Sequence, residues 1–131
     1  MAVEYLNVDG VVQTGRFRHA VRATGSSTVY LSGQVALDEA GEYVGLGDYD
    51  AQVRQVYGNL TRILESLSVG WEAVAMMHMY IVDFSVERYA RLREIRSEFL
   101  GEILPSATVI GVTALAFPEF QVEVELIVDI D

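Results

Sequence analysis

The chain has 131 residues, 51% of them apolar, and its nine basic residues against 19 acidic ones give a formal charge of −10 at pH 7. At this length a single core can remove roughly two-thirds of the unfolded chain's surface from water, so one domain spanning residues 1–131 is expected. The sequence has no Cys and no Lys, which excludes thiolate chemistry, cysteine-based zinc sites and a side-chain Schiff base.

The net negative charge and the N-terminal residues also indicate which partners are expected. An acidic chain repels nucleic acid, because phosphate binding depends on clustered positive charge, so no nucleic-acid partner is expected. The first residues lack a basic segment ahead of an apolar one, and no run of about 20 apolar residues could span a membrane. We therefore expect a cytoplasmic protein without a membrane partner, a cofactor or a metal site.

The first half of the chain predicts a strand and a long helix. Residues 29–35 have the β-branched and aromatic content of a strand, and residues 38–41 supply a turn. Residues 51–67 place apolar side chains at the spacing of one helical stripe, and Asp48 or Asp50 can cap this helix. Gly58 lowers the helix propensity of the segment, so we expect a close packing contact there.

The second half predicts a strand, a helix and two more strands. Residues 73–82 are almost all apolar, which predicts a strand buried on both faces, and His78 within it is interpreted as a hydrogen-bonded core residue. Ser85 can cap a second helix that ends near Gly101. Residues 108–115 and 121–128 predict two further strands, the second with alternating apolar and polar residues.

This order of elements predicts an α+β fold in which two helices cover one face of a mixed β-sheet. If the central strands are apolar on both faces, the face without helices needs a partner. Self-association is the simplest way to cover it.

Two groups of charged side chains are candidates for chemistry. Arg96 falls in the apolar arc of the second helix and Arg93 lies at its margin. Either their stems run along the core edge with the guanidinium groups in water, or they point into a cleft and bind a carboxylate or phosphate. Glu123 and Glu125 share one face of the last strand, which is either a solvated face or a carboxylate pair for acid–base catalysis. The expected partner surface favours the second alternative.

The chain contains, in this order, the motifs Ser32-Gly33-Gln34, residues 48–55, Asn59-Leu60, Val82-Asp83-Phe84, Pro105 and Val122-Glu123-Val124-Glu125. Their order and spacing resemble those of the YjgF or Rid (reactive intermediate deaminase) family. The resemblance extends from about residue 15 to residue 128 and implies a chorismate-mutase-like α+β sandwich that forms a homotrimer, with small-molecule ligands in clefts between subunits. Active family members hydrolyse 2-imino or enamine acids to 2-keto acids and ammonia, and some are labelled endoribonucleases.

The same resemblance assigns site residues. Glu125 matches the carboxylate that orients the attacking water, and Ser32 matches a second cleft position. Phe17 stands where the family often has an aromatic hydroxyl, and Arg93 stands where it has a cleft Asn. Ala107 replaces the substrate-gripping Arg, so the chain resembles a divergent member, for which 2-imino acid deaminase activity is expected to be weak or absent.

Three functions remain open at this point. The first is hydrolysis of an imine, an enamine or a related small substrate, with Glu125 activating water and Arg93 or Arg96 acting as a relocated anion clamp. The second is a non-catalytic trimeric ligand-binding module. The third and least favoured is an endoribonuclease. Ligand binding without turnover would select the second, and RNA cleavage abolished by a site mutation would select the third.

Overall fold

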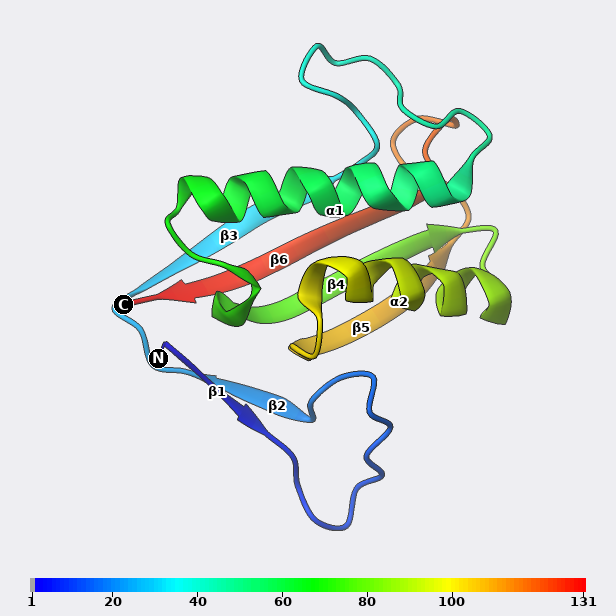
Figure 1. The fold of residues 1–131 in the computed structure, drawn as a ribbon. Helices are drawn as coiled ribbons and strands as arrows, with labels where there is room; N and C mark the ends of the chain where they lie inside the picture. The colour runs from blue at the N-terminus through cyan, green and yellow to red at the C-terminus, as the bar shows by residue number, and fades with distance from the viewer. Residues whose placement is uncertain (1) are drawn as a thin grey trace.

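The computed structural model describes residues 2–131, which form two layers of secondary structure (Figure 1). A short 3-10 turn, η1 (Trp71–Ala73), precedes the central strand β4. The remaining elements are β1 (Val3–Leu6), β2 (Ala20–Ala23), β3 (Ser27–Gln34), α1 (Tyr49–Ser66), β4 (Val74–Val82), α2 (Val86–Leu100), β5 (Ser106–Val112) and β6 (Val122–Ile130).

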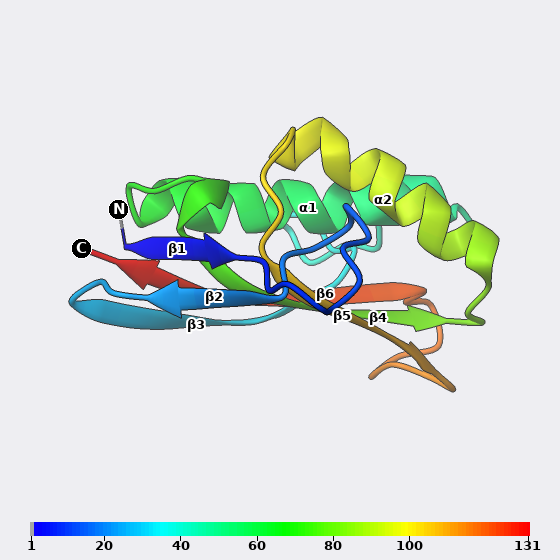
Figure 2. The same cartoon turned by 90° about the horizontal axis from the view of Figure 1, so that it is seen from below.

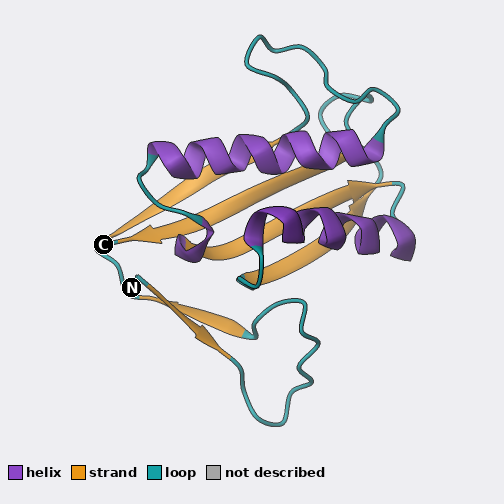
Figure 3. Ribbon diagram, in the orientation of Figure 1, coloured by secondary structure: helices purple, strands orange, loops and turns teal. Residues whose placement is uncertain are grey.

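Four strands form the main sheet in the order β3-β6-β4-β5. Strands β4 and β5 are parallel, and the other neighbours are antiparallel. Both helices lie on the same face of this sheet (Figure 2), and Figure 3 distinguishes the helix layer from the strands by colour. The mixed sheet with two helices on one face confirms the predicted α+β fold.

Helix α1 packs its apolar stripe against the sheet. The Asp48 carboxylate accepts a hydrogen bond from the backbone N–H of Ala51 at 3.1 Å and so caps the helix as predicted. Val56 and Leu60 of the stripe are fully buried in the core cluster. The predicted packing contact at Gly58 is wrong, because a methyl group built there would meet nothing within 4 Å among residues 2–131 beyond the adjacent backbone of its own helix.

Helix α2 has the predicted ends but one unexpected buried charge. The Ser85 hydroxyl accepts a hydrogen bond from the backbone N–H of Arg88 at 3.0 Å, and the helix ends at Gly101 with a φ of +58°, a conformation that favours glycine. Arg96 is only 5% exposed, so the alternative in which its guanidinium group lies in water is wrong. Within residues 2–131, neither α1 nor α2 is long and apolar enough to cross a bilayer.

Strands β1 and β2 form a separate antiparallel hairpin that was not predicted. The backbone N–H of Arg18, in the loop between them, donates to the Pro105 carbonyl at 3.3 Å, and the Tyr5 hydroxyl donates to the Glu72 carbonyl at 3.1 Å. In Figure 2 this loop rises on the helix side of the sheet. The hairpin therefore places residues 16–18 beside the start of β5.

Strand β4 is buried on one face only, which corrects the prediction of two buried faces. Met77 and Met79 are fully buried beneath the helices, whereas His78 and Tyr80 alternate with them and are partly exposed on the other face. His78 is therefore not a core residue of the single chain. We call the helix-free side of the sheet the open face; its outward side chains include Tyr30, Ser32, Met76, His78, Tyr80, Thr108, Ile110, Glu123, Glu125 and Ile127.

Candidate functional site

A carboxylate, a phenol and an imidazole meet on the open face. Glu125 on β6 is paired with His78 on β4, and Tyr80 follows two residues later on the same strand. Oε1 of Glu125 accepts a hydrogen bond from the Tyr80 hydroxyl at 2.6 Å and lies 3.3 Å from Nδ1 of His78. The side chains of His78 and Glu125 are 29% and 38% exposed, so a small molecule can reach the cluster.

Negative charge on this face shifts two pKa values. Partial burial, and then the charge of Glu125, raise the pKa of Glu123. The hydrogen bond to Glu125, together with burial and the nearby carboxylates, raises the pKa of Tyr80 to about 12. Tyr80 therefore keeps its proton at neutral pH and donates it in the hydrogen bond to Glu125.

The geometry of the cluster suits acid–base chemistry. No hydrogen bond from residues 2–131 reaches the second oxygen of Glu125, Oε2, so this atom can bind a water molecule and accept its proton. A neutral His78 that donates from Nδ1 presents Nε2 as an acceptor, whereas a protonated His78 presents a second donor. Among the described residues, no three His, Asp or Glu side chains are close enough together to hold a metal ion.

Ser32 lies on β3 in an irregular stretch of the pairing with β6. Leu31 is paired with Leu126 and Gln34 with Val124, so Ser32 and Gly33 together lie opposite Glu125. A Cβ atom built at the following residue, Gly33, would overlap the Glu123 carboxylate. Glycine at this position therefore allows the second carboxylate to lie over β3.

The other predicted site residues do not join this cluster. Arg96 lies between α2 and the sheet, with Nη1 3.9 Å from the sulfur of the buried Met79. Ala107 packs against the core on this side, and Phe17 is partly buried in the β1–β2 loop. The sheet thus separates Arg96 and Ala107 from Glu125, and one chain alone does not bring the predicted anion clamp to the predicted catalytic carboxylate.

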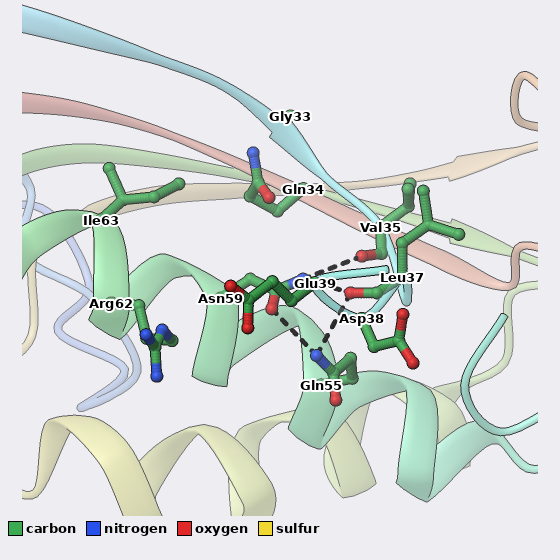
Figure 4. Close-up of a pocket in the computed structure, with 10 residues that line it drawn as sticks. All are labelled: Gly33, Gln34, Val35, Leu37, Asp38, Glu39, Gln55, Asn59, Arg62 and Ile63. Atoms are coloured by element: carbon green, nitrogen blue, oxygen red, sulfur yellow. Dashed lines mark hydrogen bonds between the residues drawn. The ribbon is translucent and has the colours of Figure 1, made fainter. Parts of the chain in front are cut away.

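A groove of about 660 Å³ between β3 and α1 is a separate surface feature (Figure 4). Gln55 and Asn59 line it, but their amide groups already donate to the Leu37 carbonyl, and Asn59 also donates to the Val35 carbonyl. These bonds hold the chain where it leaves β3. None of the predicted site residues lines this groove, so we assign its amides a structural role.

His78 and Tyr80 were not identified from the sequence as neighbours of Glu125. His78 and Tyr80 are polar residues two positions apart within an otherwise apolar segment, and side chains two apart in a strand share a face. That spacing was the available signal. The apolar residues around them suggested burial instead.

Comparison with known proteins identifies a matching family and similar solved structures. The family model described as Endoribonuclease L-PSP matches residues 10–130. The crystal structure of YyfB from Yersinia pestis, a protein of unknown function of the conserved Rid family, superposes with a TM-score of 0.92 at 30% identity, covering 99% of this chain and all of that one. A RutC family protein of Pyrococcus horikoshii is 26% identical over 113 residues, 86% of each chain. A Dermatophagoides farinae protein named 2-iminobutanoate/2-iminopropanoate deaminase is 25% identical over 117 residues, 89% of this chain and 88% of its own.

Proposed function

The chain belongs to the Endoribonuclease L-PSP family, which includes the Rid proteins, and from this membership we propose that it binds a small metabolite at Glu125 and hydrolyses a C=N or enamine group in it. The observation that carries the proposal is the Glu125 carboxylate, held by Tyr80 at 2.6 Å and beside His78, with one oxygen left for water. The name of the deaminase relative fits the same chemistry.

In the proposed reaction, Glu125 accepts a proton from a water molecule as the water oxygen bonds to the C=N carbon. The π electrons move to the nitrogen, which takes up the proton held by Glu125, and the resulting amino alcohol gives its hydroxyl proton to Glu125 as its C–N bond breaks to form a C=O group. Ammonia leaves, so one water is consumed for each imine. In this scheme His78 donates a proton to the departing nitrogen and regains one from Glu125, and Tyr80 keeps the carboxylate oriented.

The proposed site is completed by other copies of the chain. Around Glu125 the open face presents the apolar side chains of Tyr30, Met76 and Ile127. These side chains do not cover the carboxylate, which stays partly exposed in a single chain. A subunit packed against this face would exclude water and turn the face into a cleft. We propose that the assembly is a homotrimer, the form typical of the family.

Replacing Glu125 by Gln tests the proposal, because an amide cannot accept the water's proton. Imines generated by an amino-acid oxidase serve as substrates, and ammonia or keto acid release is followed. We expect Glu125→Gln to lower turnover by about 100- to 10,000-fold and to leave assembly unchanged. Glu42→Gln, at an exposed position outside the cluster, is the matched control.

The absolute rate on 2-iminopropanoate is expected to be low. Ala107 cannot form a charge-assisted pair with the substrate carboxylate, a loss of about 2 to 4 kcal/mol, or about 30- to 1000-fold in rate. Turnover by Glu125→Gln at the wild-type rate would refute Glu125 as the base. Ligand binding without turnover of any imine or enamine would instead make the protein a non-catalytic binding module.

A further inference from the structure

The helix side of the molecule contains a pocket of about 370 Å³ that the Glu125 chemistry does not use. It lies between α2, the β1–β2 loop and the segment that leads into β5, and Arg16, Arg93 and Arg96 all line it. Three of the nine basic residues of a chain with a formal charge of −10 thus meet around one cavity. Such a local reversal of charge needs an explanation.

Arg96 is a buried cation that has no counterion among the described residues. Its guanidinium group donates to the Arg16 carbonyl at 3.1 Å and to the Met79 sulfur, a weak acceptor, at 3.9 Å. None of the ion pairs found within residues 2–131 includes Arg96, although the residue is only 5% exposed. Burying a guanidinium group is unfavourable unless an anion compensates it.

Arg93 adds to the same pocket a second guanidinium group that forms no ion pair within residues 2–131. Its guanidinium carbon lies 4.7 Å from the centre of the Tyr89 ring, which holds the plane of the group in place. Its Nε is buried and has no hydrogen-bond partner in the described part of the chain. By contrast, Arg91 on the exposed side of the same helix is paired with two carboxylates at 2.9 and 2.8 Å.

We propose that this pocket binds a small anion through a carboxylate or phosphate group, with Arg96 at its base and Arg93 and Arg16 nearer its mouth. The planar fork of a guanidinium group matches both kinds of oxyanion. Glu102 also lines the pocket, but it is exposed and forms no ion pair with these arginines among the described residues. The inference goes beyond the proposed hydrolysis and does not depend on it.

Calorimetric titration of the full chain tests the inference, with pyruvate and inorganic phosphate as separate probes in a buffer free of both. We expect saturable binding of at least one probe, weakened about 10- to 100-fold in Arg96→Met. Arg16→Gln changes an exposed side chain, so it keeps the test valid if Arg96→Met fails to fold. Arg62→Gln, exposed on α1 and outside the pocket, removes the same charge and should bind like the wild type.

The two probes also identify the chemistry of the ligand, since preference for pyruvate indicates a carboxylate and preference for phosphate indicates a phosphate ester. Glu125→Gln should bind phosphate with unchanged affinity, and this keeps the result separate from the proposed hydrolysis, whose keto-acid product is pyruvate. Absence of saturable binding of both probes up to about 10 mM would overturn the inference. Binding that is equal in the wild type, Arg96→Met and Arg16→Gln would overturn it as well.

Discussion

The charge of Glu123 on the open face affects the stability of the folded protein. Its carboxylate lies two residues from Glu125 on the same face of β6, and partial burial and that neighbouring charge raise its pKa. A carboxyl group with a pKa that is higher in the folded than in the unfolded protein stabilises the fold at low pH. This contribution is lost as the pH rises through the folded-state pKa.

Glu123→Gln is therefore expected to raise the thermal unfolding midpoint at pH 7, where the wild type carries the unfavourable charge. At about pH 3, below the ordinary pKa of a glutamate, both proteins are uncharged at this position and the difference should largely disappear. Thermal unfolding followed by circular dichroism at the two pH values measures the effect. An equal shift at both pH values would show that packing, rather than charge, is responsible.

The site residues differ in how visible they are in the sequence. Glu125 is predictable, because alternation with buried Val124 and Leu126 puts it on the other face of a recognisable strand. Its contacts with Tyr80 and His78 depend on the pairing of β6 with β4, which lie far apart in the chain. No local pattern encodes that register.

At the scale of elements, helix α1 contains a position where glycine has no packing role. Gly58 lies in the middle of the helix, and a methyl group there would contact no other element of the described chain within 4 Å. Gly58→Ala should raise the free energy of unfolding by about 0.5 to 1 kcal/mol, because alanine has the higher helix propensity. Denaturant unfolding measures this gain.

Gly111 on β5 provides the matched control. A Cβ atom there would lie 2.8 Å from the Cβ atom of Phe84, closer than two carbon atoms can pack. Gly111→Ala is therefore expected to destabilise the protein in the same assay. Equal effects of the two substitutions would contradict the structural difference between these glycines.

The elements themselves were predictable where their period is long and clear. The stripe of α1 repeats over five turns of helix, and capping side chains mark the start of both helices. The hairpin was missed because β1 and β2 have only four residues each, too few to show a period. The one-sided burial of β4 was missed because apolar residues such as Met76 occupy its outer face as well, so composition hides the alternation.

The apolar side chains on the open face also bear on how the whole molecule associates with other copies. Tyr30, on the edge strand β3 of the sheet, is 76% exposed. Met76 on β4 and Ile127 on β6 are paired with each other on the same face, which no helix covers. Apolar surface of this kind on a sheet is stabilised by association with another subunit. It is also the surface on which Glu125 lies, so assembly and the proposed site depend on each other.

We expect the wild type to be a trimer in solution, with a mass about three times 14.5 kDa by light scattering after gel filtration. Ile127→Arg places a charge in the centre of the open face, where a partner would have to bury it, and should give monomers at micromolar concentration. Val86→Arg adds the same charge at the 73% exposed start of α2, on the other side of the molecule, and should remain trimeric. A monomeric wild type would refute the assembly, and a trimeric Ile127→Arg would show that the subunits associate through a different surface.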